Sequence, residues 1–274
     1  MTPSEGAMRL ELGPLLAGAL SFWRRRWATL CVLIVTLDWG PRFGLFLTGT
    51  HVYATGSRDP AAFAAFSFQS TLLLFCSLLM QASAAALALG ARKQIVSAMA
   101  AIALVIRRLP SLAPWWVLIS LPAATTLWIR WSSATPRDYA ATYVWRLVGD
   151  TVFGITVATA IGLVWLVVLA ENEGGPTALK RGLSLMTGHR GIIFVVAFTA
   201  DVIGLIINLS VPYLEQIALS LGLGRNGAVA AAYVMAFLWE ATAVVMNLAY
   251  VQLYRELVRA HDGVAPGELA HIFA

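Results

Sequence analysis

The sequence predicts an all-α integral membrane protein, and three observations support this. Hydrophobic residues make up 59% of the 274 residues and charged residues 12%, with a mean hydropathy of +0.76. Soluble domains carry roughly 25% charged residues. Apolar runs recur along the whole chain, and the basic residues gather between them. Because a soluble protein of this length does not need so much apolar surface, we expect the bilayer to be its solvent.

Six apolar runs approach the roughly 20 residues that span a bilayer. They lie at about 28–49, 67–90, 112–130, 143–170, 191–212 and 226–254. The first run contains "TLDWGPRFG" in its second half. Because proline removes a helical hydrogen bond, we expect this span to be kinked or broken there.

The basic residues predict the orientation. Of the 19 lysines and arginines, 13 lie at one set of span ends, and cytoplasmic loops carry the excess of basic residues. Both termini then lie in the cytoplasm, as an even number of spans requires. The first residues, "MTPSEGAMRLELG", lack the pattern of a removable signal peptide.

Three basic, amphipathic segments predict an internal repeat. They are "MRLELGPLLAGALSFWRRRW" (8–27), "ARKQIVSAMAAIALVIRRLP" (91–110) and "ENEGGPTALKRGLSLMTGHRG" (171–191), and Arg24, Arg107 and Arg190 are each 83 residues apart. Each segment precedes a span. We therefore expect a single domain, 1–274, built from three units of one surface "elbow" helix and two spans, at about 8–90, 91–173 and 174–258, with a tail at 259–274.

The third elbow has clear helix boundaries. Pro176 suits a first helical turn and Gly188 suits a helix end. Leu179, Leu183 and Met186 share one face, and we expect Lys180, Arg181 and Ser184 on the other face to meet anionic headgroups.

A phosphate-binding loop is excluded there, because no strand precedes it and the spacing of the motif is absent. Anchoring to lipid in general and binding of one lipid phosphate both remain open. The candidate lipid or partner contacts are Arg24, Arg25, Arg26, Arg107, Arg108, Lys180, Arg181 and Arg190.

A further helix is expected at the outer surface. In "PYLEQIALSLGLGRNG", the residues Leu214, Ile217, Ala218 and Leu221 have the spacing of one helical face.

Ionisable residues inside spans are costly and raise a functional hypothesis. Five are present: Asp38, Arg146, Asp150, Asp201 and Glu240. Arg146 and Asp150 are four residues apart and can pair on one helix. Asp38 can cap the broken helix or pair with Arg42.

Asp201 and Glu240 lie near the middle of consecutive spans, with no basic residue within a turn. They can be neutral carboxyl groups that hydrogen-bond between helices, part of a proton or cation path, or contacts to a partner subunit. Asn208, Asn247 and Thr199 are candidate donors to them.

Short stretches resemble a known family. "ALKRGLSLMTGHRGIIFVVAF", "FWRRRWATLCVLIV" and "NLAYVQLYRELVRA" resemble segments of bacterial six-span proteins of the glycerophosphoryl diester phosphodiesterase membrane domain and YciC-type inner-membrane families. The resemblance implies a multi-pass protein of the bacterial inner membrane. In that family the phosphodiesterase activity belongs to a separate soluble domain, and we expect no such domain here.

These observations favour a non-catalytic accessory or scaffold subunit that organises lipids or a membrane protein complex. The main alternative is a small transporter or channel that uses Asp201 and Glu240. An intramembrane lipid enzyme is a third, weaker reading, because no nucleophile, base or metal set can be assembled. We expect no cofactor, no metal site and no nucleic-acid binding, with membrane lipids and a complex or homo-oligomer as partners.

Overall fold

The computed structural model describes residues 11–47, 60–90, 97–132, 136–222 and 224–263, and all regular elements in these ranges are helices. In chain order these are α1 (Leu12–Ile34), η1 (Val35–Trp39, a π-helix), α2 (Gly40–Leu47), α3 (Pro60–Leu89), α4 (Ala98–Ser132), α5 (Pro136–Ile161), α6 (Val164–Glu171), α7 (Gly175–Met186), α8 (Arg190–Ser220) and α9 (Gly224–Asp262). The all-α prediction is confirmed.

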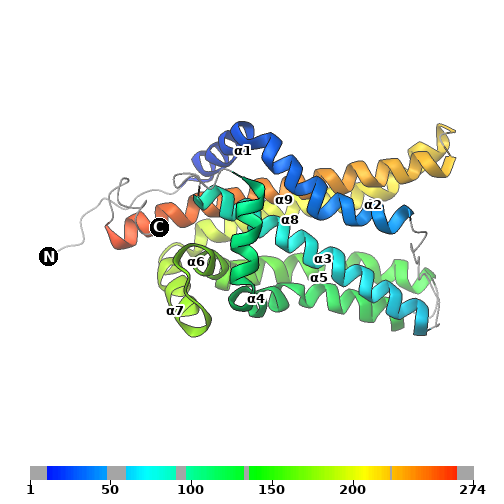
Figure 1. The fold of residues 1–274 in the computed structure, drawn as a ribbon. Helices are drawn as coiled ribbons and strands as arrows, with labels where there is room; N and C mark the ends of the chain where they lie inside the picture. The colour runs from blue at the N-terminus through cyan, green and yellow to red at the C-terminus, as the bar shows by residue number, and fades with distance from the viewer. Residues whose placement is uncertain (1–10, 48–59, 91–96, 133–135, 223, 264–274) are drawn as a thin grey trace.

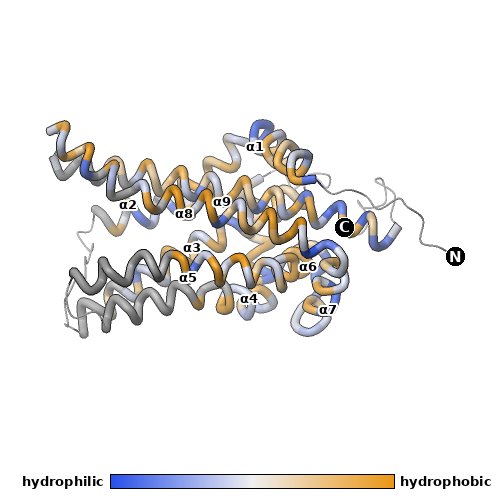
Figure 2. Tube along the Cα trace, turned by 180° about the vertical axis from the view of Figure 1, so that it is seen from behind, coloured by the Kyte–Doolittle hydropathy of each residue, from blue (hydrophilic) through white to orange (hydrophobic). Residues whose placement is uncertain are grey.

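Five helices of the described ranges are long and apolar enough to cross a membrane, and the count rises to six if α5 and α6 form one bent span. The long helices run roughly side by side, and α1 begins at the same end of the bundle at which α9 stops (Figure 1). The hydropathy colouring is mostly apolar along these helices and more hydrophilic near α7 and the end of α9 (Figure 2). The chain therefore has the architecture of a multi-pass membrane protein.

The core is built from residues of α1, α3, α4, α6, α7, α8 and α9. Small residues of α3 and large residues of α9 are fully buried there, among them Ala84, Ala85, Ala88, Leu253 and Tyr254. Small side chains allow close approach of helices, which replaces the hydrophobic driving force that is missing between helices in lipid.

The first span remains helical through its expected break. The chain widens into the π-helix Val35–Trp39 and continues as an α-helix from Gly40, so Pro41 lies directly after a π-helical turn, and both features interrupt the regular helical hydrogen-bond ladder. A separate kink lies at Arg26, whose φ of −120° and ψ of 18° are not helical.

The fourth span is bent where none was expected. Val148–Ile161 and Val164–Glu171 meet at 49°. A Cβ at Gly162 would lie 2.3 Å from the backbone oxygen of Ala158, so the bend requires glycine at this position.

Two other sequence predictions on helix boundaries were wrong. The expected elbow 91–110 and span 112–130 are not separated, because α4 runs from Ala98 to Ser132 without interruption. The expected outer surface helix is the end of α8, which continues to Ser220.

The elbow α7 is confirmed as a helix that has proline in its first turn, and Gly188 follows it with a φ of +83°. Met186 is buried as predicted, but the other buried residues, Ala178, Gly182 and Leu185, each lie one position before a predicted one. The reason is packing on α6, because a Cβ at Gly182 would lie 2.7 Å from the side chain of Val164.

Candidate functional site

A buried ion pair lies in the π-helical segment of the first span. Asp38 is completely buried, and the Nε of Arg42 donates to both of its carboxylate oxygens, at 3.0 and 2.8 Å. This pairing is one of the two roles that the sequence predicts for Asp38. A π-turn often marks a functional site, because it departs from the regular helical ladder.

The last span brings a second carboxylate to this pair. Glu240 of α9 is buried, and its Oε1 lies 3.5 Å from a terminal nitrogen of Arg42. The hydroxyl of Ser77, from α3, is 3.1 Å from each carboxylate oxygen of Glu240. One guanidinium thus stands between two carboxylates, so the group of three carries one net negative charge when all are ionised.

Hydrogen bonds continue from Glu240 along α3. The amide nitrogen of Gln81 donates to the Ser77 hydroxyl at 3.2 Å, and the amide nitrogen of Asn247 donates to Gln81 Oε1 at 2.9 Å. We call Asp38, Arg42, Glu240, Ser77, Gln81 and Asn247 the polar chain. It links the first, second and last spans through side chains only.

The polar chain ends at a cavity of about 270 Å³. Gln81 and Asn247 line it, together with Trp115 and Trp116 of α4 and Trp165 of α6. The bend at Gly162 also lies in its wall. Helix breaks in membrane proteins are tolerated where they line such a cavity, because the freed backbone groups find partners there.

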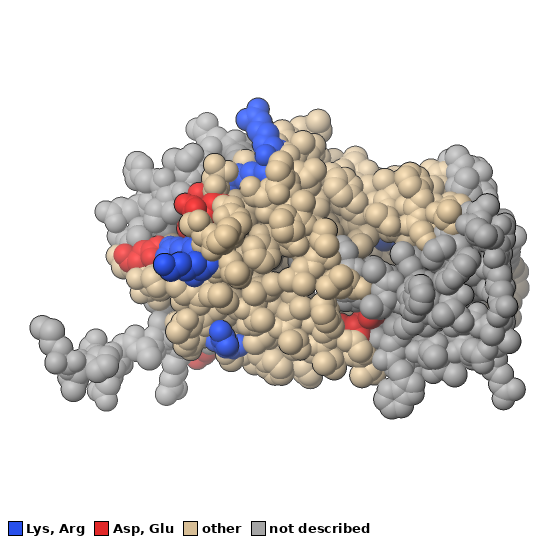
Figure 3. Space-filling view, turned by 90° about the horizontal axis from the view of Figure 1, so that it is seen from below, with Lys and Arg blue, Asp and Glu red and all other residues tan. Residues whose placement is uncertain are grey.

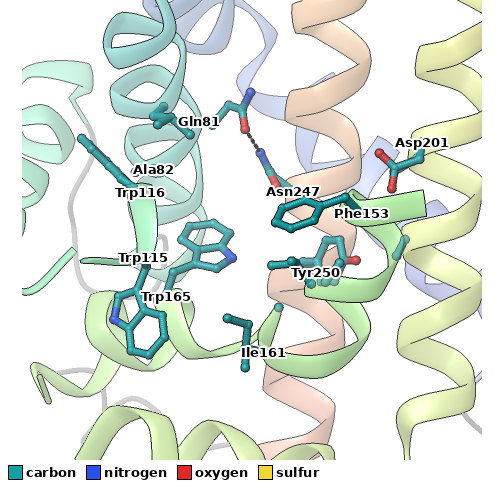
Figure 4. Close-up of a pocket in the computed structure, with 17 residues that line it drawn as sticks. Gln81, Ala82, Trp115, Trp116, Phe153, Ile161, Trp165, Asp201, Asn247 and Tyr250 are labelled. Atoms are coloured by element: carbon teal, nitrogen blue, oxygen red, sulfur yellow. Dashed lines mark hydrogen bonds between the residues drawn. The ribbon is translucent and has the colours of Figure 1, made fainter. Parts of the chain in front are cut away.

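Asp201 of α8 lies in the same cavity (Figure 4). A Cβ at Gly154 of α5 would lie 3.2 Å from both of its carboxylate oxygens, so the absence of a side chain at Gly154 makes room for this carboxylate. Figure 4 shows Asp201 and Tyr250 on the side of α8 and α9, with the three tryptophans across the cavity.

Two buried polar atoms of the cavity wall have no hydrogen-bond partner within the described part of the chain. They are the hydroxyl of Tyr250 and the indole nitrogen of Trp115. Buried polar groups are nearly always paired, so each such atom calls for an explanation. The cavity wall is therefore mostly apolar but contains polar atoms that can bind a ligand.

Asp201 and Glu240, which lie near the middle of consecutive spans, have different surroundings in the structure. Glu240 belongs to the Asp38–Arg42 pair, whereas Asp201 lies in the cavity. Of the donors proposed for them, Asn247 binds Gln81 and Thr199 binds the backbone oxygen of Val195. The side chains of Asn208 and Arg146 lie outside the described residues, and Asp150 is partly buried on α5.

The basic elbow residues fall into two groups. Arg181 hydrogen-bonds to Asp262, with one contact of 3.0 Å, and pairs with Glu171 at 3.2 Å. Arg108 donates to the backbone oxygens of Val168 and Leu169, at the end of α6. These two arginines are therefore engaged by the protein itself.

The hydrogen bond to Asp262 raises the pKa of the Arg181 guanidinium above its ordinary value, although burial opposes this, and the Glu171 carboxylate adds to it. The remaining candidates are more open. Arg26 is partly buried, and the exposed ones are Arg24, Arg25, Arg107, Lys180 and Arg190. Most lysines and arginines of the face in Figure 3 lie toward the end of the molecule that carries α7.

Within the described ranges, no group of three or more histidine, cysteine or acidic side chains is arranged to hold a metal ion. Cys31 and Cys76 are free thiols.

Sequence reasoning missed several residues of the site. Neither Ser77 nor Gln81 was predicted as a site residue. Their spacing of four residues, on one helical face, was the available signal. Tyr250 and Trp115 gave no signal of a site, because an aromatic residue in a span is usual.

No protein-family model, curated protein or solved structure matches the chain. The resemblance to the phosphodiesterase membrane domain therefore stays a prediction from short motifs.

Proposed function

We propose that this protein is a small membrane carrier that uses its intramembrane carboxylates, Asp201 and Glu240, to move a solute or protons. The observation that supports this most is the polar chain, which leads from the Asp38–Arg42 pair through Glu240 to the cavity that holds Asp201. A buried charge group of this kind is costly in a membrane, and such groups mark ion and substrate pathways.

Proton flux in proteoliposomes tests the proposal. An imposed pH difference should collapse faster, as reported by an entrapped pH-sensitive dye, than in protein-free vesicles. Glu240→Gln should slow this collapse, because an amide cannot release a proton. The conservative control is Glu256→Gln, whose partner Arg259 lies at the end of the last span. Equal rates in protein-free, native and Glu240→Gln vesicles, with and without added solute, would remove the carrier proposal.

A second candidate is the accessory or scaffold module that the sequence favoured. The exposed basic residues Arg24, Arg25, Arg107, Lys180 and Arg190 support it, because each basic residue near an anionic surface contributes about 1 kcal/mol. It requires no solute flux. Purification in a mild detergent followed by mass spectrometry should then recover a stoichiometric protein partner or a bound anionic lipid.

The finer topology belongs to the same proposal. The excess of basic residues at one set of span ends supports a bacterial inner-membrane protein with both termini in the cytoplasm. The spacing of 83 residues supports three repeats of an elbow and two spans. Accessibility of single cysteines placed at residues 24 and 107 to a membrane-impermeant reagent tests the sidedness.

A further inference from the structure

We infer that the cavity beside Asp201 is a binding site for a small, largely apolar organic amine, held as its ammonium form by the Asp201 carboxylate. The inference names the solute class for the proposed carrier, and it rests on that proposal only for transport, since binding can be measured alone.

The charged residues of the cavity wall determine whether a cation or an anion can bind. Among the described residues that line the cavity, Asp201 is the one acidic side chain, and no lysine, arginine or histidine accompanies it. The described residues also give Asp201 no ion-pair partner, unlike Glu240. A cation supplies the missing countercharge, whereas an anion would be repelled.

The aromatic side chains favour the same ligand. Trp115, Trp116, Trp165, Phe153 and Tyr250 all line the cavity. Aromatic faces attract organic cations, and tryptophan does so most strongly. The rest of the wall is mainly alanine and aliphatic residues, so it suits an apolar body behind the charged group.

The unpaired polar atoms specify the head of the ligand further. Tyr250 is only 8% exposed, and its hydroxyl has no partner among the described residues. A hydroxyl accepts as well as donates, so an ammonium can donate one N–H to Asp201 and another to Tyr250. The Trp115 indole nitrogen only donates, so it forms no hydrogen bond with the ammonium group.

The cavity volume limits the size of the ligand. A cavity of about 270 Å³ is slightly smaller than the ~300–1,000 Å³ of sites for drug-sized ligands. A one-ring amine such as phenethylamine matches it. A lipid acyl chain would fill the apolar space without using Asp201, and the test separates the two.

Calorimetric titration of the purified full-length protein with phenethylamine, at a pH at which the amine is protonated, tests the inference. The native protein should bind it, and 3-phenylpropionate should not bind. Propylbenzene has the shape of the amine without the charge and should not compete. Asp201→Asn should weaken binding roughly 10- to 100-fold, and Tyr250→Phe roughly threefold to tenfold.

Gly154→Leu provides an independent variant, because it places a side chain where the Asp201 carboxylate lies 3.2 Å away. It should abolish binding while Glu256→Gln binds like the native protein. Equal competition by propylbenzene, native-like binding by Asp201→Asn or by Tyr250→Phe, or no binding of the amine at all would overturn the inference. Binding of the amine without flux would support the inferred ligand class and contradict the carrier proposal. Proton flux without binding of the amine would support the carrier proposal and contradict the inferred ligand class.

Discussion

Glu240 and Asp201 are both acidic residues in the middle of apolar spans, yet their surroundings are opposite. Glu240 is fully buried and contacts Arg42 and Ser77. Asp201 is half-buried and faces an aromatic cavity, where the hydroxyl of Tyr250 and the indole nitrogen of Trp115 have no partner within the described part of the chain. A satisfied carboxylate holds helices together, whereas a carboxylate that faces open space is available to a ligand. We therefore assign helix packing and proton transfer to Glu240, and ligand binding to Asp201.

The largest expected effect comes from removing the shared cation. Arg42→Met leaves Asp38 and Glu240 buried close to each other without countercharge, and breaking a buried ion pair costs about 3–5 kcal/mol. The free energy of unfolding, measured by SDS titration in mixed micelles, should fall by this amount. A loss below about 1 kcal/mol would mean that the guanidinium does not hold the group together.

The contact between α8 and α9 near the two acids gives the second-largest expected loss of stability. A Cβ at Gly204 of α8 would lie 2.3 Å from the ring of Trp239 of α9, next to Glu240. Gly204→Ala should cost about 1–3 kcal/mol, as overpacking does. The matched control is Gly191→Ala on the same helix, where a Cβ meets nothing within 4 Å, and equal losses in the two variants would contradict this packing.

Matched amide substitutions test the comparison directly. Glu240→Gln should lose about 1 kcal/mol of stability, because it weakens charged contacts to Arg42 and Ser77. Asp201→Asn should change stability by less than about 0.5 kcal/mol. Both values come from the same SDS titration. A larger loss for Asp201→Asn than for Glu240→Gln would reverse the roles assigned here.

The smallest expected effect lies at the elbow. Arg181→Gln removes partly exposed ion pairs with Glu171 and Asp262 and should cost about 0.2–1 kcal/mol, less at high salt. Lys180→Gln, on the exposed side of α7, should leave stability unchanged and instead lower binding of the reconstituted protein to anionic lipid. The same stability loss in both variants would show that the elbow basic residues do not divide into protein and lipid contacts.

The linear pattern was enough to predict the membrane class, the all-helical fold and helix α7, because apolar length, charge content, proline and glycine act locally along the chain. It also identified the costly residues Asp38, Asp201 and Glu240 by their chemistry alone. It misjudged α4 and the end of α8, since the apolar pattern does not show whether one helix continues or two meet.

The surroundings of each acidic residue depend on how the helices pack. Arg42 and Glu240 are 198 positions apart in the chain, and only the packing of the first span on the last brings them together. The bare backbone at Gly154 likewise makes room for Asp201 only because α5 packs against α8. Which carboxylate is satisfied and which is exposed to a ligand depends on contacts between distant segments, and a linear pattern does not contain these.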